Sequence, residues 1–198
     1  PMPEDSILEM AKTSQREPVE LAYDMLLERE GRELMLFPLA NFSEGNHDVL
    51  REMNLAEGTL PGLSDGGAHC GVICDASFPT YMLTHWARDR RRGEKLPLEY
   101  VVQRQTRDTA RQEGLNDRGT LEAGMMGDVN VIDFEELSLR PPEMVYDLPA
   151  GGRRLVQRAT GYVATIKKGE VIFADGQSTG HRPGQLIRGP KAQRGLES

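Results

Sequence analysis

The chain has 198 residues, 38% of them hydrophobic and 28% charged, so it is long enough to bury a core and is not disordered as a whole. Acidic residues outnumber basic residues by 31 to 24, and this net charge of −7 disfavours a nucleic acid or an anionic membrane as partner. Apolar runs such as residues 34–36 are far shorter than the ~20 residues of a spanning helix, and no signal-peptide pattern precedes them, so we expect a cytoplasmic protein.

The first part of the chain alternates helical periodicity with short apolar runs. The spacing of apolar residues predicts an amphipathic helix over residues 17–30 and a shorter helix over residues 46–53. Residues 34–39 and residues 59–64 are apolar runs too brief for helices, which indicates buried strands. Strand, helix and strand at this spacing are typical of a parallel sheet.

The second part changes from helical spacing to alternation. Helices are predicted over residues 78–90 and 97–114, the second interrupted near Thr106. Further on, glycines become frequent and polar residues alternate with apolar ones. This pattern predicts a strand over residues 128–133 and a hairpin whose strands meet at Lys168–Gly169.

These elements divide the chain into three parts and predict an α/β fold. We expect the α/β part over residues 1–118, a small antiparallel β unit over residues 119–183 and a flexible tail over residues 184–198. The two cysteines, Cys70 and Cys74, have the spacing of neither a zinc knuckle nor a disulfide framework. We interpret them as small apolar filler in a reducing compartment.

The strongest candidate for chemistry follows the second predicted strand, in the segment Ser64-Asp65-Gly66-Gly67-Ala68-His69. Catalytic groups and ligands gather at the carboxyl end of parallel strands, where loops are free of packing constraints. There Asp65 can ligate a divalent metal through one oxygen and accept a proton from the metal-bound water. Gly66 and Gly67 allow a substrate to approach the backbone closely, and His69 is a further substrate-binding candidate.

Each of these residues also has a purely structural interpretation. Ser-Asp-Gly is common turn chemistry, so Asp65 could serve only as a turn residue. His69 could be a polar loop residue whose hydrogen bonds go to the backbone. Ser64 has no histidine nearby to act as its base, which argues against a nucleophilic serine.

Other conspicuous residues favour structural roles. The remaining histidines form no His-x-His or His-x-x-x-His pair and are interpreted as structural; they are His47, His85 and His181. An aromatic and methionine stripe is interpreted as core, and it consists of Phe78, Tyr81, Met82 and Trp86. The arginine-rich residues 88–92 are interpreted as a solvated helix end.

With these motifs in order, the sequence resembles the C-terminal part of the D-aminoacylase (N-acyl-D-amino-acid deacylase) branch of the amidohydrolase superfamily. The similarity covers most of the chain, and Gly127 stands where the family usually has an alanine. The matching segments are Ser64-Asp65-Gly66, residues 106–110, Gly114-Leu115, residues 117–121, Gly124, residues 127–133 and residues 165–171, then Gly176, Gly180, Pro183-Gly184 and Arg188.

The resemblance implies a metal-dependent hydrolase of amide or related C–N bonds. It implies the last units of a (β/α)8 barrel followed by a small β-sandwich domain. Zinc or a similar ion would polarise the substrate carbonyl and supply hydroxide, and Asp65 would both bind this metal and carry the proton to the leaving amine.

Two departures from the family pattern limit what is expected. The His-Pro-Arg element of the D-aminoacylases is replaced by residues 69–75, so an N-acyl-D-amino acid is one substrate candidate among several. A barrel needs ~250 residues, whereas only two barrel strands are predicted, and the superfamily's histidine ligands have no counterpart. Asp65 alone cannot hold a metal.

We therefore expect a C-terminal fragment of an amidohydrolase, or one subunit of a split enzyme, which is inactive in isolation. Open strand edges favour a homo-oligomer or association with the missing N-terminal part. Within the same class, a cyclic amidohydrolase of the hydantoinase or dihydroorotase type is the alternative. The alternative from another class is a non-catalytic oligomerisation or interaction module.

Overall fold

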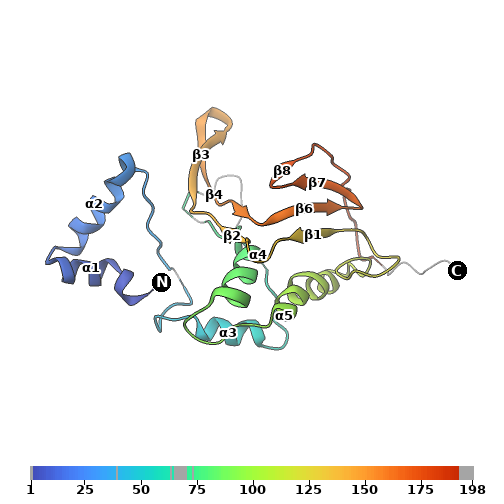
Figure 1. Cartoon of the computed structure of the whole chain (residues 1–198), viewed down its shortest axis with the longest axis horizontal. Helices are drawn as coiled ribbons and strands as arrows, with labels where there is room; N and C mark the ends of the chain where they lie inside the picture. Colours follow the sequence, from blue (N-terminus) through green and yellow to red (C-terminus); the bar gives the residue numbers. More distant parts are fainter. Residues whose placement is uncertain (1, 39, 63, 65–70, 73, 192–198) are drawn as a thin grey trace. The chain divides into compact units, whose positions relative to one another are not determined.

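A computed structural model of the chain describes residues 2–38, 40–62, 64, 71–72 and 74–191 (Figure 1). The chain forms two compact units, Pro1–Leu50 and Arg51–Ser198. No helix in these described ranges is long and apolar enough to cross a membrane.

The first unit is built on a pair of helices. A short 3-10 turn, η1 (Pro3–Asp5), precedes α1 (Ile7–Ser14) and α2 (Pro18–Gly31). The hydroxyl of Ser6 caps α1 by accepting the N–H of Glu9 at 3.3 Å. An ion pair between Arg16 and Asp24 ties the connection to α2. The helix predicted over residues 17–30 is confirmed, although residues 28–30 leave helical geometry.

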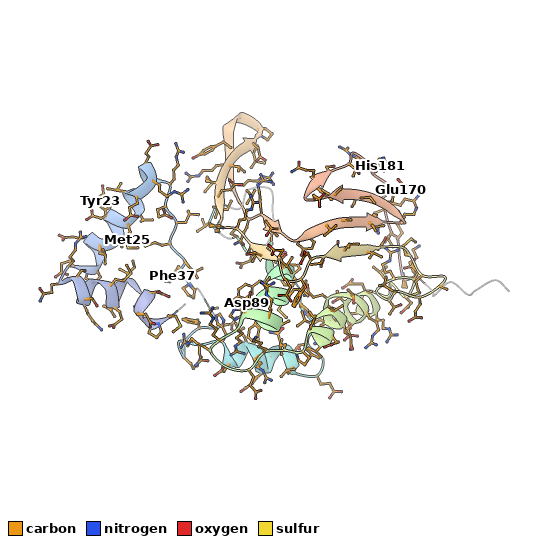
Figure 2. The ribbon with its side chains drawn as sticks, in the orientation of Figure 1. Tyr23, Met25, Phe37, Asp89, Glu170 and His181 are labelled. Carbon is orange, nitrogen blue, oxygen red and sulfur yellow. The ribbon has the colours of Figure 1, made fainter. Side chains whose placement is uncertain are left out.

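The strand predicted over residues 34–39 is wrong for the part that the structure describes. Residues 33–38 adopt no regular secondary structure, and Leu36 and Phe37 are each 79% exposed (Figure 2). Residues 59–62 are likewise irregular. A strand exists only where a neighbour accepts its backbone hydrogen bonds, and no described segment pairs with either run. The predicted parallel sheet, and with it any barrel, is therefore not present in the described residues.

The helices of the second unit confirm the sequence pattern and add one feature to it. α3 (Asp48–Leu55) spans the boundary between the units, and it confirms the second predicted helix. The helix predicted over residues 78–90 is α4 (Phe78–Tyr81) continued by the π-helix η2 (Met82–Asp89). In η2 the N–H of Arg90 reaches back five residues to the carbonyl of His85, at 2.8 Å.

The predicted helix over residues 97–114 also changes type along its length. It is composed of α5 (Leu98–Gln103), the π-helix η3 (Arg104–Asp108) and α6 (Thr109–Gln112). The interruption expected near Thr106 therefore falls inside η3. A π-helical turn loosens the regular ladder without ending the helix, which explains why the helical pattern continues across it.

The antiparallel β unit is confirmed. Its four-stranded sheet has the order β1-β6-β7-β8, formed by β1 (Val129–Ile132), β6 (Tyr162–Lys167), β7 (Glu170–Ala174) and β8 (Gln177–Ser178). Two further antiparallel pairs are β2 (Ser138–Leu139) with β5 (Ala159–Thr160), and β3 (Glu143–Leu148) with β4 (Gly152–Val156), the latter joined by the 3-10 turn η4 (Pro149–Gly151). Figure 1 shows β3 and β4 as a hairpin that extends away from the sheet.

The core of the second unit lies between its helices and the β unit. Met82 and Trp86 are 7% and 3% exposed, which confirms the core interpretation for these two members of the stripe. Leu96, Val101 and Leu137 complete the fully buried apolar set. Fully burying side chains of this size stabilises a fold by about 1.5–3 kcal/mol each.

The interpretation of residues 88–92 as a solvated helix end is wrong for Arg90. Arg90 is 3% exposed, and it donates from Nε to the carbonyl of Arg92 at 2.9 Å and from Nη1 to that of Glu94 at 2.8 Å. Its guanidinium also lies 4.6 Å from the centre of the Trp86 ring. A planar guanidinium can satisfy several carbonyls at once while its faces stack on an aromatic ring, so burial costs it less than it would cost a lysine.

Candidate functional site

The candidate site residues predicted from the sequence lie outside the part of the chain that the structure describes. These are Asp65, Gly66, Gly67 and His69, and Cys70 lies there too. Ser64 is half-buried, as is Cys74 on the other side of the segment. The structure therefore shows which contacts hold the residues immediately before and after this segment.

The flank before the segment is anchored by Thr59. Its hydroxyl lies 2.7 Å from the carbonyl of Met53 and 2.9 Å from that of Ala56, at the end of α3. The same hydroxyl accepts a hydrogen bond from Nη2 of Arg104 in η3, at 3.2 Å. Three hydrogen bonds to two separate helices fix the chain five residues before Ser64.

The flank after the segment is anchored to the β unit. The hydroxyls of Thr80 in α4 and Tyr162 in β6 are hydrogen-bonded at 2.8 Å. The hydroxyl of Ser77 donates to the side-chain oxygen of Gln157, between β4 and β5. Because Thr80 is only 6% exposed, its bond to Tyr162 is shielded from water, and removing one partner would leave a buried polar group unsatisfied.

The last residue of α4 and the middle of η2 form a stack of rings. The rings of Tyr81 and His85 are parallel at 4.6 Å, and the ring of Trp86 meets that of His85 edge-on at 5.4 Å. Burial raises the pKa of the Tyr81 hydroxyl, and the charge of Arg90 offsets part of that rise. Tyr81 therefore stays protonated at neutral pH.

The other described histidines are far from this stack in the sequence and have different neighbours. His47 meets the ring of Phe42 edge-on at 5.1 Å. His181 lies 3.7 Å from the carboxylate of Glu170 on β7, and both side chains are exposed (Figure 2). Across the described ranges, no three His, Cys, Asp or Glu side chains are grouped so as to hold a metal ion. These residues by themselves thus do not fit a metal.

A charged cluster that the sequence did not single out lies in the β unit. Arg118 pairs with Asp117 at 2.9 Å and with Asp128 at 3.2 Å, and Lys167 pairs with Asp128 at 2.6 Å. Burial raises the pKa of Asp128, but hydrogen bonds from Lys167 Nζ and the Lys168 N–H, together with Arg118, lower it below its ordinary value. The pairing of β1 with β6 brings Asp128, which directly precedes β1, next to Lys167 and Lys168.

Comparison with known proteins identifies the family of the chain. The model of the amidohydrolase family matches residues 2–173, which is most of the chain. The chain belongs to the amidohydrolase family. No curated protein and no solved structure matches it.

For this amidohydrolase, the family assignment supports hydrolase activity on amide-type bonds. Amidohydrolases generally depend on a metal ion, and the match covers Asp65 and both anchored flanks. The match also covers the whole of β6 and most of β7, so the helical part and the central sheet of the β unit belong to one family domain.

Proposed function

We propose that this amidohydrolase chain supplies the catalytic aspartate, Asp65, of an enzyme that hydrolyses the amide bond of N-acyl-D-amino acids. The family match over residues 2–173 carries the proposal. The ordered D-aminoacylase motifs from Ser64 to Arg188 support the choice of branch. The hydrogen bonds of Thr59 and Thr80 hold the described residues on either side of the Asp65 segment, which supports a site there, because a catalytic carboxylate needs supporting structure around it.

In this proposal Asp65 has the catalytic role, and the residues that follow it bind the substrate. Asp65 provides one carboxylate oxygen to a divalent metal, for which zinc is the first choice, and moves a proton from the attacking water to the leaving nitrogen. The metal, when bound, lowers the pKa of water and polarises the carbonyl. Gly66 and Gly67 leave room for the substrate beside the backbone, and His69 contributes a hydrogen bond to it.

The remaining ligands must come from outside this sequence. The chain has four histidines, and no two of them have the spacing of a histidine ligand pair. We therefore propose that the chain is inactive alone and acts after association with the portion of a barrel that carries those histidines. The substrate is a small molecule.

The second candidate belongs to a different class of function. Because the sequence contains no histidine pair with metal-ligand spacing, a non-catalytic interaction module is this second candidate. Within the enzyme class, a cyclic amidohydrolase shares the same aspartate and differs only in its substrate. The experiment must separate all three possibilities.

The test offers N-acetyl-D-amino acids, their L-enantiomers and hydantoin, with zinc present, to the chain alone and to the assembly that includes the histidine-bearing barrel portion. We expect no turnover by the chain alone and D-selective turnover by the assembly. Asp65→Ala should lower kcat of the assembly about 10²- to 10⁴-fold, as expected for loss of a general base. Asp75→Ala, which removes an exposed carboxylate nearby in the sequence, is the matched control and should leave kcat unchanged.

The outcomes differ for each candidate. Turnover by the chain alone, at the rate of the assembly, would contradict the need for further ligands. An unchanged kcat in Asp65→Ala would assign this aspartate to the turn and favour the interaction module. Preference for hydantoin would keep the enzyme class but replace the acyl-amino-acid substrate.

A further inference from the structure

A cavity of about 220 Å³ lies in the β unit next to the charged cluster. Its walls come from segments that are distant in sequence: Asp117 and Arg118 after α6, the turn between β6 and β7, and residues 185–191. The last of these segments is fixed by the backbone of Lys191, whose N–H donates to the carbonyl of Gly114 at 2.7 Å and whose carbonyl accepts from Asn116 at 3.0 Å. Hydrogen bonds of the main chain thus fix this wall of the cavity.

The cavity concentrates positive charge in a chain whose net charge is −7. Four cationic residues line it, namely Arg118, Lys167, Lys168 and Lys191. Asp117 and Asp128 pair with Arg118 and Lys167. Among the described residues no carboxylate lies within ion-pair distance of Lys168 or Lys191. Four cations beside two carboxylates leave two positive charges, those of Lys168 and Lys191, without an ion-pair partner in the part of the chain that the structure describes.

Lys168 is placed there against its own backbone preference. Its φ is +52°, in the left-handed region that side chains other than glycine and asparagine rarely adopt. The carboxylate of Asp128 holds it by accepting its N–H at 3.0 Å. Lys168 and Gly169 form the two-residue turn between β6 and β7, a turn that uses positive φ at both positions, and the bond to Asp128 fixes this turn beside the cavity.

The remaining wall consists of the polar side chain of Gln185 and three apolar side chains. Leu186 and Ile187 lie on the segment that covers the cavity, and Met126 lies beside the start of β1. A ligand that fills this volume can therefore place its charge at the lysines and a short carbon chain against these three side chains.

We propose that this cavity binds a small organic dianion, a phosphate monoester or a dicarboxylate with a short apolar portion. Two uncompensated ammonium groups match two negative charges, and charge-assisted hydrogen bonds from lysine are the strong contacts that such a ligand offers. This site is separate from the hydrolysis proposed for Asp65 and does not depend on it.

Calorimetric titration of the purified chain at low ionic strength tests the proposal, with inorganic phosphate, phenyl phosphate and succinate as probes. We expect saturable binding of phenyl phosphate, weaker binding of inorganic phosphate, and loss of affinity with added salt. The double variant Lys168→Gln/Lys191→Gln should weaken binding at least tenfold. Lys95→Gln removes an exposed lysine elsewhere in the same unit and should have no effect.

A second variant separates loss of the site from loss of the fold. Lys168→Arg/Lys191→Arg keeps both charges and should retain binding, while circular dichroism verifies that each variant is folded. Succinate binding that depends on the same two lysines supports the proposal and assigns the site to carboxylates. Absence of saturable binding of all three probes, or binding that the glutamine variant leaves unchanged, overturns it.

Discussion

Arg88 shows how much a single side chain contributes to joining the helices to the β unit. Its guanidinium donates to the backbone carbonyls of Phe134, Glu135 and Leu137, which lie between β1 and β2. It also lies 5.4 Å from the centre of the Phe134 ring. One residue at the end of η2 therefore satisfies three acceptors of a loop 46 to 49 residues away.

Replacing this arginine by lysine should destabilise the chain although the charge is kept. An ammonium cannot reach three carbonyls with the geometry of a planar fork, so we expect Arg88→Lys to cost about 1.5–3 kcal/mol of unfolding free energy. Arg91→Lys, at an exposed neighbour, should stay within about 0.5 kcal/mol. Urea unfolding monitored by the fluorescence of Trp86 measures both, and equal values for the two variants would contradict the role given to Arg88.

Asp128 predicts how stability depends on pH. Its pKa is lower in the folded chain than its ordinary value near 3.9, so its charged form stabilises the fold above that value. That contribution is lost as pH falls through the lowered folded pKa. We expect Asp128→Asn to cost about 1–3 kcal/mol at pH 7, and the difference from the natural chain to shrink below about pH 4.

Urea unfolding at a series of pH values measures this difference. Asp175→Asn is the control, because Asp175 is exposed and asparagine is well suited to its positive φ. Its free energy should follow that of the natural chain at every pH. A penalty for Asp128→Asn that persisted undiminished in acid would show that the charge of Asp128 is not what stabilises the fold.

At the residue scale, the sequence identifies candidate residues within a contiguous motif but does not reveal pairs of residues that are distant along the chain. A motif such as Ser64-Asp65-Gly66 is contiguous, so it can be found without a structure. The three carbonyls bound by Arg88 and the partners of Asp128 are distant in sequence, and nothing in the local pattern indicates them. For the same reason the arginine-rich helix end was interpreted as solvated, although Arg90 is buried.

Among the elements, the bend before β6 depends on one glycine. Gly161 has a φ of +88°, and a Cβ added to it would lie 2.5 Å from Cα and 2.7 Å from N of Leu137. Leu137 is itself fully buried, and the carbonyl of Gly161 accepts the N–H of Asp133 at 2.8 Å. Backbone therefore packs on backbone at this point.

We expect Gly161→Ala to cost about 3 kcal/mol or more, because both the conformation and the space exclude a methyl group. Gly169→Ala is the matched control: its φ is +82°, but no atom lies within 4 Å of the added Cβ. Only the conformational cost of about 1–2 kcal/mol applies there. Thermal unfolding ranks the two variants, and similar losses would mean that the contact with Leu137 relaxes freely.

Helices whose apolar periodicity extends over many residues, and hairpins with a clear turn sequence, can be predicted from the sequence. Short apolar runs cannot be assigned in this way. The helices and the hairpin of β6 and β7 follow from periodicity and from Lys168–Gly169. Residues 34–39 have the composition of a strand, yet composition supplies no partner, and a strand without a partner does not form. Neither did the sequence indicate that η2 and η3 have π-helical geometry, since the apolar spacing of one widened turn is hardly different from that of an α-helix.

At the scale of the whole molecule, much apolar surface remains exposed in the first unit. Val19 is 80% exposed, Tyr23 62%, and Leu36 and Phe37 79% each; Figure 2 labels Tyr23 on α2 and Phe37 on the segment after it. Exposed apolar side chains in this number favour association.

We therefore expect the mass measured by light scattering to rise with protein concentration. Leu36→Ser/Phe37→Ser should reduce this rise, because it removes two of the most exposed apolar side chains without affecting a buried one. Leu121→Ser, at an equally exposed leucine of the second unit, is the control. A mass that stays monomeric over the accessible concentration range would contradict the expectation.

The hydrogen bond from the N–H of Arg90 to the carbonyl of His85, five residues earlier, changes the number of residues in this turn of the helix. A π-helical turn holds one residue more than the α-helical turn it replaces, so η2 contains, in effect, an inserted residue. Deleting one residue from η2 would restore α-helical winding and turn everything downstream by about 100°. Arg88 would then face away from its three carbonyls, so the extra residue sets the phase at which this helix meets the β unit.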